Sequence, residues 1–171
     1  MKVSDLVGEF LARHVKHVFC ISGGASLHLI HGIAKAKGIT YVCPQHEQAA
    51  GFAADAYARL TGMGCALATS GPGATNLITA IGASWYDSVP VLYLTGQVTK
   101  ARMSPKGTVR QTGFQETPIV EIVQSITKYA VTVMEPHRVI PTLEWAIAIA
   151  KSGRPGPVLV DIPDDIQRAE I

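Results

Sequence analysis

Short apolar runs alternate with segments of helical periodicity along most of the chain. The runs at 18–21, 39–42, 65–69, 91–94, 129–133 and 158–160 are typical of strands, and the most continuous of them fit burial on both faces of a sheet. Between them apolar residues recur every three or four positions, as at Leu27, Ile30 and Ile33, which predicts helices. This alternation predicts an α/β fold, a three-layer sandwich with a parallel sheet between layers of helices.

Capping and turn residues predict where several helices begin and end. Ser4 can cap the first helix, and further helices are expected at about 46–60 and 75–85. Gly153 stands where the carboxyl cap of the last long helix is expected. Residues 96–115 lose the periodicity and predict a long loop, of a kind that often carries function.

Composition and charge narrow the classes of partner. Charged residues make up 16% of the chain, the formal net charge is +2, and Lys and Arg are scattered. This balance predicts neither a nucleic-acid partner nor an anionic membrane partner. Few charges combined with many small apolar residues indicate that a partner subunit or further domains cover part of the surface.

Cys20, Cys43 and Cys65 form no CxxC pair, and each lies in an apolar run. We therefore expect three reduced core cysteines in a cytoplasmic protein. The first residues have no signal-peptide layout, and no apolar run is long enough to span a membrane.

The first candidate for chemistry is Glu47, in a segment that follows a strand and opens an alanine-rich helix. Ligands of open α/β sheets bind at such strand ends, although an acid in the first turn can also serve only to complement the helix dipole. The segment from Thr69 to Asn76 and the segment from Ser22 to Ser26 follow other strands, with glycines that let a backbone approach a ligand.

Two other patterns are weaker. The Thr69–Asn76 segment lacks the lysine of a P-loop and does not match GxGxxG, so it does not predict phosphate binding. His14 with His17 and His28 with His31 have the spacing of neighbours on a helix face, but neither pair has a third ligand. We therefore predict no metal site within the chain.

Taken in order, these segments resemble the N-terminal domain of the acetolactate synthase group of thiamine diphosphate enzymes. The resemblance covers almost the whole chain and is carried by the segments at 46–51, 57–59, 69–76, 94–98, 113–116, 128–129 and 152–163. It implies a six-stranded parallel sheet flanked by helices. It also implies that Glu47 hydrogen-bonds the aminopyrimidine ring of thiamine diphosphate and so activates the cofactor.

The resemblance implies further site residues and a substrate class. Pro72 and Asn76 would lie against the pyrimidine. On the substrate side it places Gly23, Gly24, Ala25, Phe114 and Gln115. Members of the family decarboxylate a 2-oxo acid, often pyruvate, and transfer the remaining carbon unit to an acceptor.

A part of the family's machinery is not found in this sequence. The family holds the diphosphate and Mg²⁺ with a GDG sequence followed further along by NN, and no such pattern occurs here. We therefore expect a domain at 1–163, the start of a linker at 164–171, and no activity of this chain alone. It would be a fragment of a longer enzyme or a subunit of a split enzyme. The resemblance implies a homodimer or homotetramer with the site between subunits, and it allows for FAD in the full-length protein.

The acceptor is less well defined than the cofactor. Thr112 stands where an acidic residue is commoner in acetolactate synthases, so a related carboligase for a branched sugar or another acyloin is an alternative. Glu47 argues against glyoxylate carboligase, which lacks this glutamate. A non-catalytic assembly or regulatory domain on the same scaffold is a further alternative, because fold does not determine function.

Overall fold

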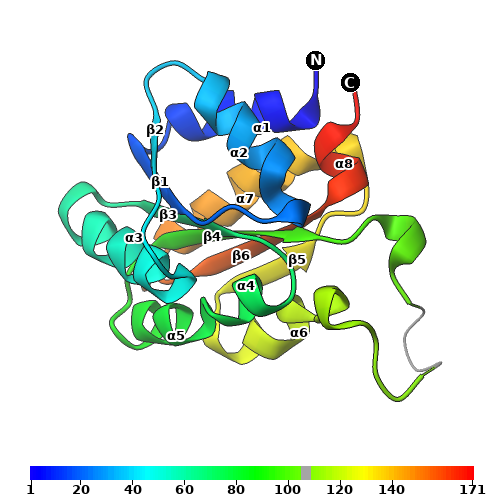
Figure 1. Ribbon diagram of the computed structural model, residues 1–171. Helices are drawn as coiled ribbons and strands as arrows, with labels where there is room; N and C mark the ends of the chain where they lie inside the picture. Colours follow the sequence, from blue (N-terminus) through cyan, green and yellow to red (C-terminus); the bar gives the residue numbers. More distant parts are fainter. Residues whose placement is uncertain (105–108) are drawn as a thin grey trace.

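The computed structural model describes residues 1–104 and 109–171 (Figure 1). In this part of the chain the strands form one six-stranded sheet in the order β2-β1-β3-β4-β6-β5, and every pairing is parallel. The strands are β1 (His17–Cys20), β2 (Thr40–Val42), β3 (Gly64–Ala68), β4 (Val91–Gln97), β5 (Tyr129–Thr132) and β6 (Val158–Pro163). The predicted fold class is confirmed.

Helices cover both faces of this sheet (Figure 1). One layer contains α1 (Val3–Ala12), α2 (Leu27–Lys35), α7 (Val139–Lys151) and α8 (Asp164–Arg168). The other contains α3 (Glu47–Thr61), α4 (Pro72–Thr75), α5 (Ile78–Tyr86) and α6 (Ile119–Val123). Short 3-10 turns lie at Gly24–Ser26, Lys100–Arg102, Phe114–Glu116, Gln124–Ile126 and Pro136–Arg138.

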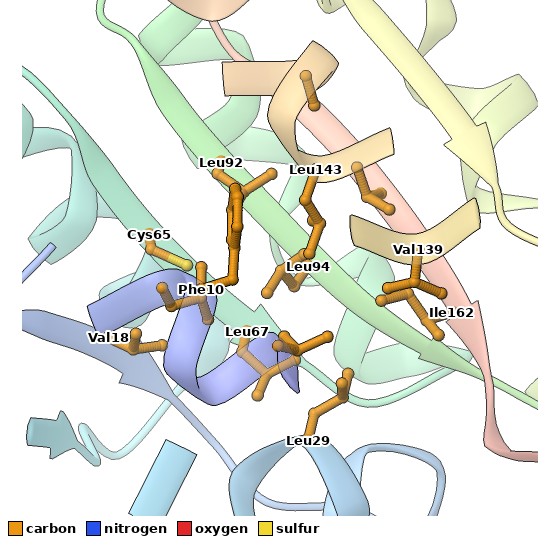
Figure 2. Packing of buried hydrophobic residues seen from close by; sticks show 14 of the residues in the cluster. Phe10, Val18, Leu29, Cys65, Leu67, Leu92, Leu94, Val139, Leu143 and Ile162 are labelled. Carbon is orange, nitrogen blue, oxygen red and sulfur yellow. The ribbon is translucent and has the colours of Figure 1, made fainter. Parts of the chain in front are cut away.

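A separate apolar core lies on each face of the sheet. Beneath α1, α2 and α7, the side chains of Phe10, Leu29 and Leu143 pack towards those of strands β3 and β4, such as Leu67 and Leu92 (Figure 2). The core on the opposite face is built largely from alanines and includes the buried ring of a tyrosine, Tyr93. Small side chains let α3 pack closely on its neighbours, so the start of this helix is held firmly against the sheet.

Three local predictions are corrected by the structure. Ser4 does not cap α1, because the helix begins at Val3, whose backbone N–H is already bonded to the carbonyl of Ala169 at 2.9 Å. The helix expected at 75–85 begins later, at Ile78, as α5, and a separate short helix, α4, precedes it. Ser152, and not Gly153, is the carboxyl cap of α7, although Gly153 follows it with a φ of 51°.

The cysteine prediction is correct for two residues and wrong for the third. Cys20 and Cys65 are buried, whereas Cys43 is exposed. The reason is that β2 is an edge strand whose three residues are all exposed, so the apolar run that ends near Cys43 does not enter the core.

The C-terminal residues pack against the domain. Residues 164–168 form α8, in which Ile166 and Gln167 are buried, and Glu170 makes an antiparallel bridge with Lys2. The boundary expected after Pro163 stays a prediction, since it concerns segments outside this chain.

Candidate functional site

The order of the strands creates a crevice at the carboxyl ends of β1 and β3. From β1 the chain crosses to β2 on one side, and from β3 it crosses to β4 on the other side. The two connections diverge, which leaves room between them for a ligand. The loops at 22–26 and 69–76 both begin at this point.

Glu47 is the first residue of α3 and is partly buried at the edge of this crevice. Its carboxylate Oε2 accepts a hydrogen bond of 2.9 Å from Nδ2 of Asn76. The imidazole Nδ1 of His46 accepts the backbone N–H of Gln48 at 3.1 Å and so caps the helix. A loop after β2 and a loop after β3 thus meet through two side chains.

Gly73 provides the surface beside this carboxylate. A Cβ atom added at Gly73 would lie 3.3 Å from Oε1 of Glu47 and 2.7 Å from Cγ2 of Thr69. Only a residue without a side chain fits here, so the backbone of Gly73 packs directly against the Thr69 side chain and the Glu47 carboxylate.

The neighbouring loops are packed backbone against backbone. The hydroxyl of Thr69 accepts the backbone N–H of Ala25 at 3.2 Å, and a Cβ at Gly23 would meet the Thr69 side chain at 2.4 Å. Gly71 has a φ of 61°, and a Cβ there would lie 2.6 Å from the carbonyl oxygen of Phe114. Three loops that are distant in sequence therefore form one wall.

A cavity of about 350 Å³ opens beside this wall. Its lining includes Gly24, Ala25, Pro72, Phe114 and Gln115, which are five of the residues expected at the site from the sequence. Glu47, Asn76 and Gly23 do not line it; they lie next to it through the contacts described above.

Some of the lining residues are not among those expected. They are Thr69, Ser70, Val98, Thr99, Arg102 and Asp164. The only signal in the sequence for Arg102 is its place in the long polar loop at 96–115, of which residues 105–108 lie outside the described part. Asp164 lies 3.6 Å from Nε2 of His28 and 3.4 Å from Nε of Arg168.

A second cavity, of about 570 Å³, lies towards β5 and contains a buried carboxyl group at its base. Asp161 accepts hydrogen bonds from Thr95 at 2.7 Å, Thr132 at 3.0 Å and Gln97 at 3.3 Å. Burial raises the pKa of Asp161 to about 7, although each of these hydrogen bonds lowers it. Strands β4, β5 and β6 are joined through this one side chain.

Asp55 anchors α3, the helix that carries Glu47. The carboxylate of Asp55 accepts hydrogen bonds of 2.7 Å from both Ser84 on α5 and Arg59 on its own helix. The Ser84 hydroxyl also lies 2.9 Å from the Tyr93 hydroxyl, and burial raises the pKa of Tyr93. This network connects α3 with α5 and β4.

Within residues 1–104 and 109–171, no group of three or more His, Cys, Asp or Glu side chains is placed to hold a metal ion. In the same residues, each helix is too short or too polar to cross a membrane.

Comparison with known proteins gives a consistent picture. Residues 1–125 match the family model described as "Thiamine pyrophosphate enzyme, N-terminal TPP binding domain". Over 98% of its length the chain is 45% identical to acetolactate synthase 2 of Nicotiana tabacum and to acetolactate synthase of Arabidopsis thaliana, both named as chloroplastic. It spans 24% of the length of each of these two relatives. The chain belongs to the family of N-terminal TPP-binding domains of thiamine pyrophosphate enzymes.

Proposed function

We propose that this chain is the pyrimidine-binding part of an acetolactate synthase-like enzyme that decarboxylates a 2-oxo acid and transfers the two-carbon unit to an acceptor. The observation that carries the proposal is the pairing of Glu47 with Asn76, with the backbone of Gly73 close to the same carboxylate. When bound, thiamine diphosphate supplies an acidic thiazolium carbon that lets a 2-oxo acid lose carbon dioxide.

Glu47 holds a proton at the ring nitrogen of the aminopyrimidine. Asn76 donates to Oε2 and so orients the carboxylate, which leaves the other oxygen, Oε1, as the atom that would accept from the ring. A carboxyl group suits this task because it can share a proton with a ring nitrogen through a short, directional hydrogen bond. Pro72, whose carbonyl accepts the backbone N–H of Asn76 at 3.0 Å, would lie against the ring.

The substrate side of the site is the cavity beside the pyrimidine position. Gly24, Ala25, Phe114 and Gln115 line it, and its volume of about 350 Å³ accommodates a small 2-oxo acid such as pyruvate. Gly23 acts indirectly, since its contact with Thr69 holds the loop that carries Gly24 and Ala25.

The remaining parts of the site come from outside this chain. The curated relatives are about four times as long, which leaves room for domains that hold the diphosphate, Mg²⁺ and, in the complete protein, FAD. A homodimer or homotetramer, with each site shared between subunits, fits a half-site of this kind. A cytoplasmic location also stays a prediction, because the relatives are named as chloroplastic.

The test is the rate of carbon dioxide release from pyruvate by the complete protein with thiamine diphosphate and Mg²⁺. Because the proton shared by Glu47 is required for activation, Glu47→Gln should lower the rate by roughly 100-fold or more. Glu9→Gln on the exposed side of α1 is the control and should leave the rate unchanged. Equal rates for Glu47→Gln and the wild type would refute the role of Glu47.

Analysis of the products of the same reaction, with candidate acceptors added, identifies the acceptor. Acetolactate among the products supports the synthase, whereas a branched sugar or another acyloin formed in its place favours the related carboligase suggested by Thr112. Absence of any decarboxylation by the complete wild-type protein would point to a non-catalytic domain.

A further inference from the structure

The cysteines lie on three neighbouring strands at one edge of the sheet. Cys20 ends β1, Cys43 directly follows the edge strand β2, and Cys65 lies in β3. Phe19 is the register partner of Val42, so the next position along both parallel strands places Cys20 beside Cys43. On the other side, Cys20 pairs with Leu67, and Cys65 is two positions away.

Register partners in a parallel sheet point to the same face, and neighbouring strands are about 4.8 Å apart. A disulfide accepts Cα separations of about 4.4 to 6.8 Å. Continuing the register by one position therefore puts the two cysteine backbones about one strand spacing apart, within this range. The sulfur atoms interact in the reduced protein: burial, and after it the neighbouring Cys43, raise the pKa of the Cys20 thiol to about 12.

The two thiols differ in their access to solvent. Cys43 is exposed, whereas the exposed fraction of Cys20 is 0%. A small oxidant in solution reaches Cys43 first, and Cys20 is then the neighbouring thiol that can react with the oxidised sulfur. An accessible thiol beside a second thiol that can resolve it is an arrangement often found at sites of reversible oxidation.

We propose that Cys20 and Cys43 are a modification site at which a peroxide closes a reversible disulfide between β1 and β2. The Cys43 thiolate attacks the peroxide, forms a sulfenic acid and releases water or an alcohol. The Cys20 sulfur then attacks the Cys43 sulfur, the S–S bond forms, and the hydroxide leaves with the Cys20 proton as water. Two thiols lose two electrons in total, and the peroxide is reduced.

The position of this bond connects it with the site described above. Cys43 precedes Glu47 by four residues, and the intervening turn contains Pro44 and His46, the residue that caps α3. A bond to Cys20 fixes the end of an otherwise exposed edge strand, from which this turn begins. The proposal itself does not depend on the role of Glu47, because its test detects only the bond.

The test uses the complete protein, reduced, treated with hydrogen peroxide, blocked with N-ethylmaleimide and digested with trypsin without reductant. Cleavage at Lys and Arg puts the three cysteines into separate peptides, at 17–35, 38–59 and 60–100. The expected result is a linked pair of peptides 17–35 and 38–59 that disappears on reduction. Cys65→Ser is the matched control and should leave the linked pair intact.

Several results would overturn the proposal. These are a disulfide that includes the peptide 60–100, sulfinic or sulfonic acid at Cys43 with no linked pair, or unreacted thiols at both positions. Cys43→Ser, at an exposed site that tolerates the change, should abolish the linked pair and protect Cys20 from peroxide. Oxidation of Cys20 in that variant at the wild-type rate would show that Cys43 is not the point of entry.

Discussion

Asn76 and Glu47, which are 29 positions apart in the chain, are joined by a hydrogen bond of 2.9 Å from Nδ2 to Oε2. One residue follows α4 and the other begins α3, so two loops from opposite sides of β1 determine the orientation of a single carboxylate. Without its amide donor, the Glu47 side chain would be free to adopt other rotamers.

In the complete protein, Asn76→Ala should therefore lower the rate of carbon dioxide release without abolishing it. A hydrogen bond to a charged group contributes about 1.5 to 3 kcal/mol, so we expect a loss of roughly 10- to 100-fold in kcat. Thr75→Ala, which removes an exposed bond to the Pro72 carbonyl, is the control. Steady-state kinetics at saturating cofactor measure both, and an unchanged kcat for Asn76→Ala would contradict the positioning role.

Gly96→Ala should disturb the wall of the site. A Cβ there would lie 1.9 Å from the carbonyl oxygen of Ala25, so one of the two backbones has to move. We expect a loss of about 1 to 3 kcal/mol in the free energy of unfolding, measured by urea titration of the 171-residue chain.

Gly82→Ala is the matched control for this substitution. A Cβ at Gly82 in α5 meets nothing within 4 Å, and alanine favours a helix over glycine by up to about 1 kcal/mol. The control should be neutral or stabilising. Equal midpoints of unfolding for the two variants would show that the close approach of Gly96 to Ala25 does not restrict which residue can stand at position 96.

The buried carboxyl of Asp161 should make stability depend on pH. In the unfolded chain an aspartate has a pKa of about 3.9. In the folded protein the pKa of Asp161 is raised to about 7, and the main cause is its burial. The neutral carboxyl group of Asp161 therefore makes its full contribution to the free energy of unfolding below about pH 4. This contribution is lost as the pH rises through about 7.

Urea unfolding at pH 5 and pH 8 measures this effect. The wild-type chain should lose stability between the two, and Asp161→Asn, which does not titrate, should lose less. If the variant and the wild type show the same difference between pH 5 and pH 8, Asp161 is not the group responsible.

Asp55→Ala should weaken the attachment of α3. The substitution leaves the buried Ser84 hydroxyl and the Arg59 guanidinium without this partner, and a cost of about 2 to 4 kcal/mol in unfolding free energy is expected. Asp87→Ala removes the other, exposed partner of Arg59 and should cost about 1 kcal/mol at most. Similar losses for the two variants would exclude a special role for Asp55.

The 171-residue chain should bind thiamine diphosphate only weakly. On the proposed function, its site contacts only the pyrimidine, and the charged diphosphate would be held through Mg²⁺ by residues outside the chain. Calorimetric titration with cofactor and Mg²⁺ should detect little heat at micromolar concentrations. Tight binding to this chain alone would contradict the proposal that residues outside the chain hold the diphosphate.

Much of the architecture could be predicted because local patterns determine it. Continuous apolar strands separated by helices allow hardly any arrangement but a covered parallel sheet. The order of the strands could not be predicted, because β5 crosses to the edge and β6 returns beside β4, a choice made by long-range packing. Cys43 is exposed because that order puts β2 at the edge of the sheet. The apolar residues around Cys43 therefore wrongly indicated that it is buried.

The candidate site, too, has a part that could be predicted from the sequence and a part that could not. Loops at strand ends can be assigned from sequence, so the closeness of Ala25 and Pro72 was predictable in outline. The bond between Glu47 and Asn76 required the strand order, since β1 must lie between the strands that precede them. Ser4 shows the limit of a local rule: a distant carbonyl, that of Ala169, already satisfied the helix start.

The two ends of the chain form a small ladder of their own. The amino group of Met1 donates to the Ile171 carbonyl at 2.9 Å, and the Ile171 N–H donates to the Met1 carbonyl at 3.0 Å. With the bridge between Lys2 and Glu170, these bonds hold residues at opposite ends of the described chain side by side, so the start of α1 and the end of α8 are fixed to each other at one place on the surface.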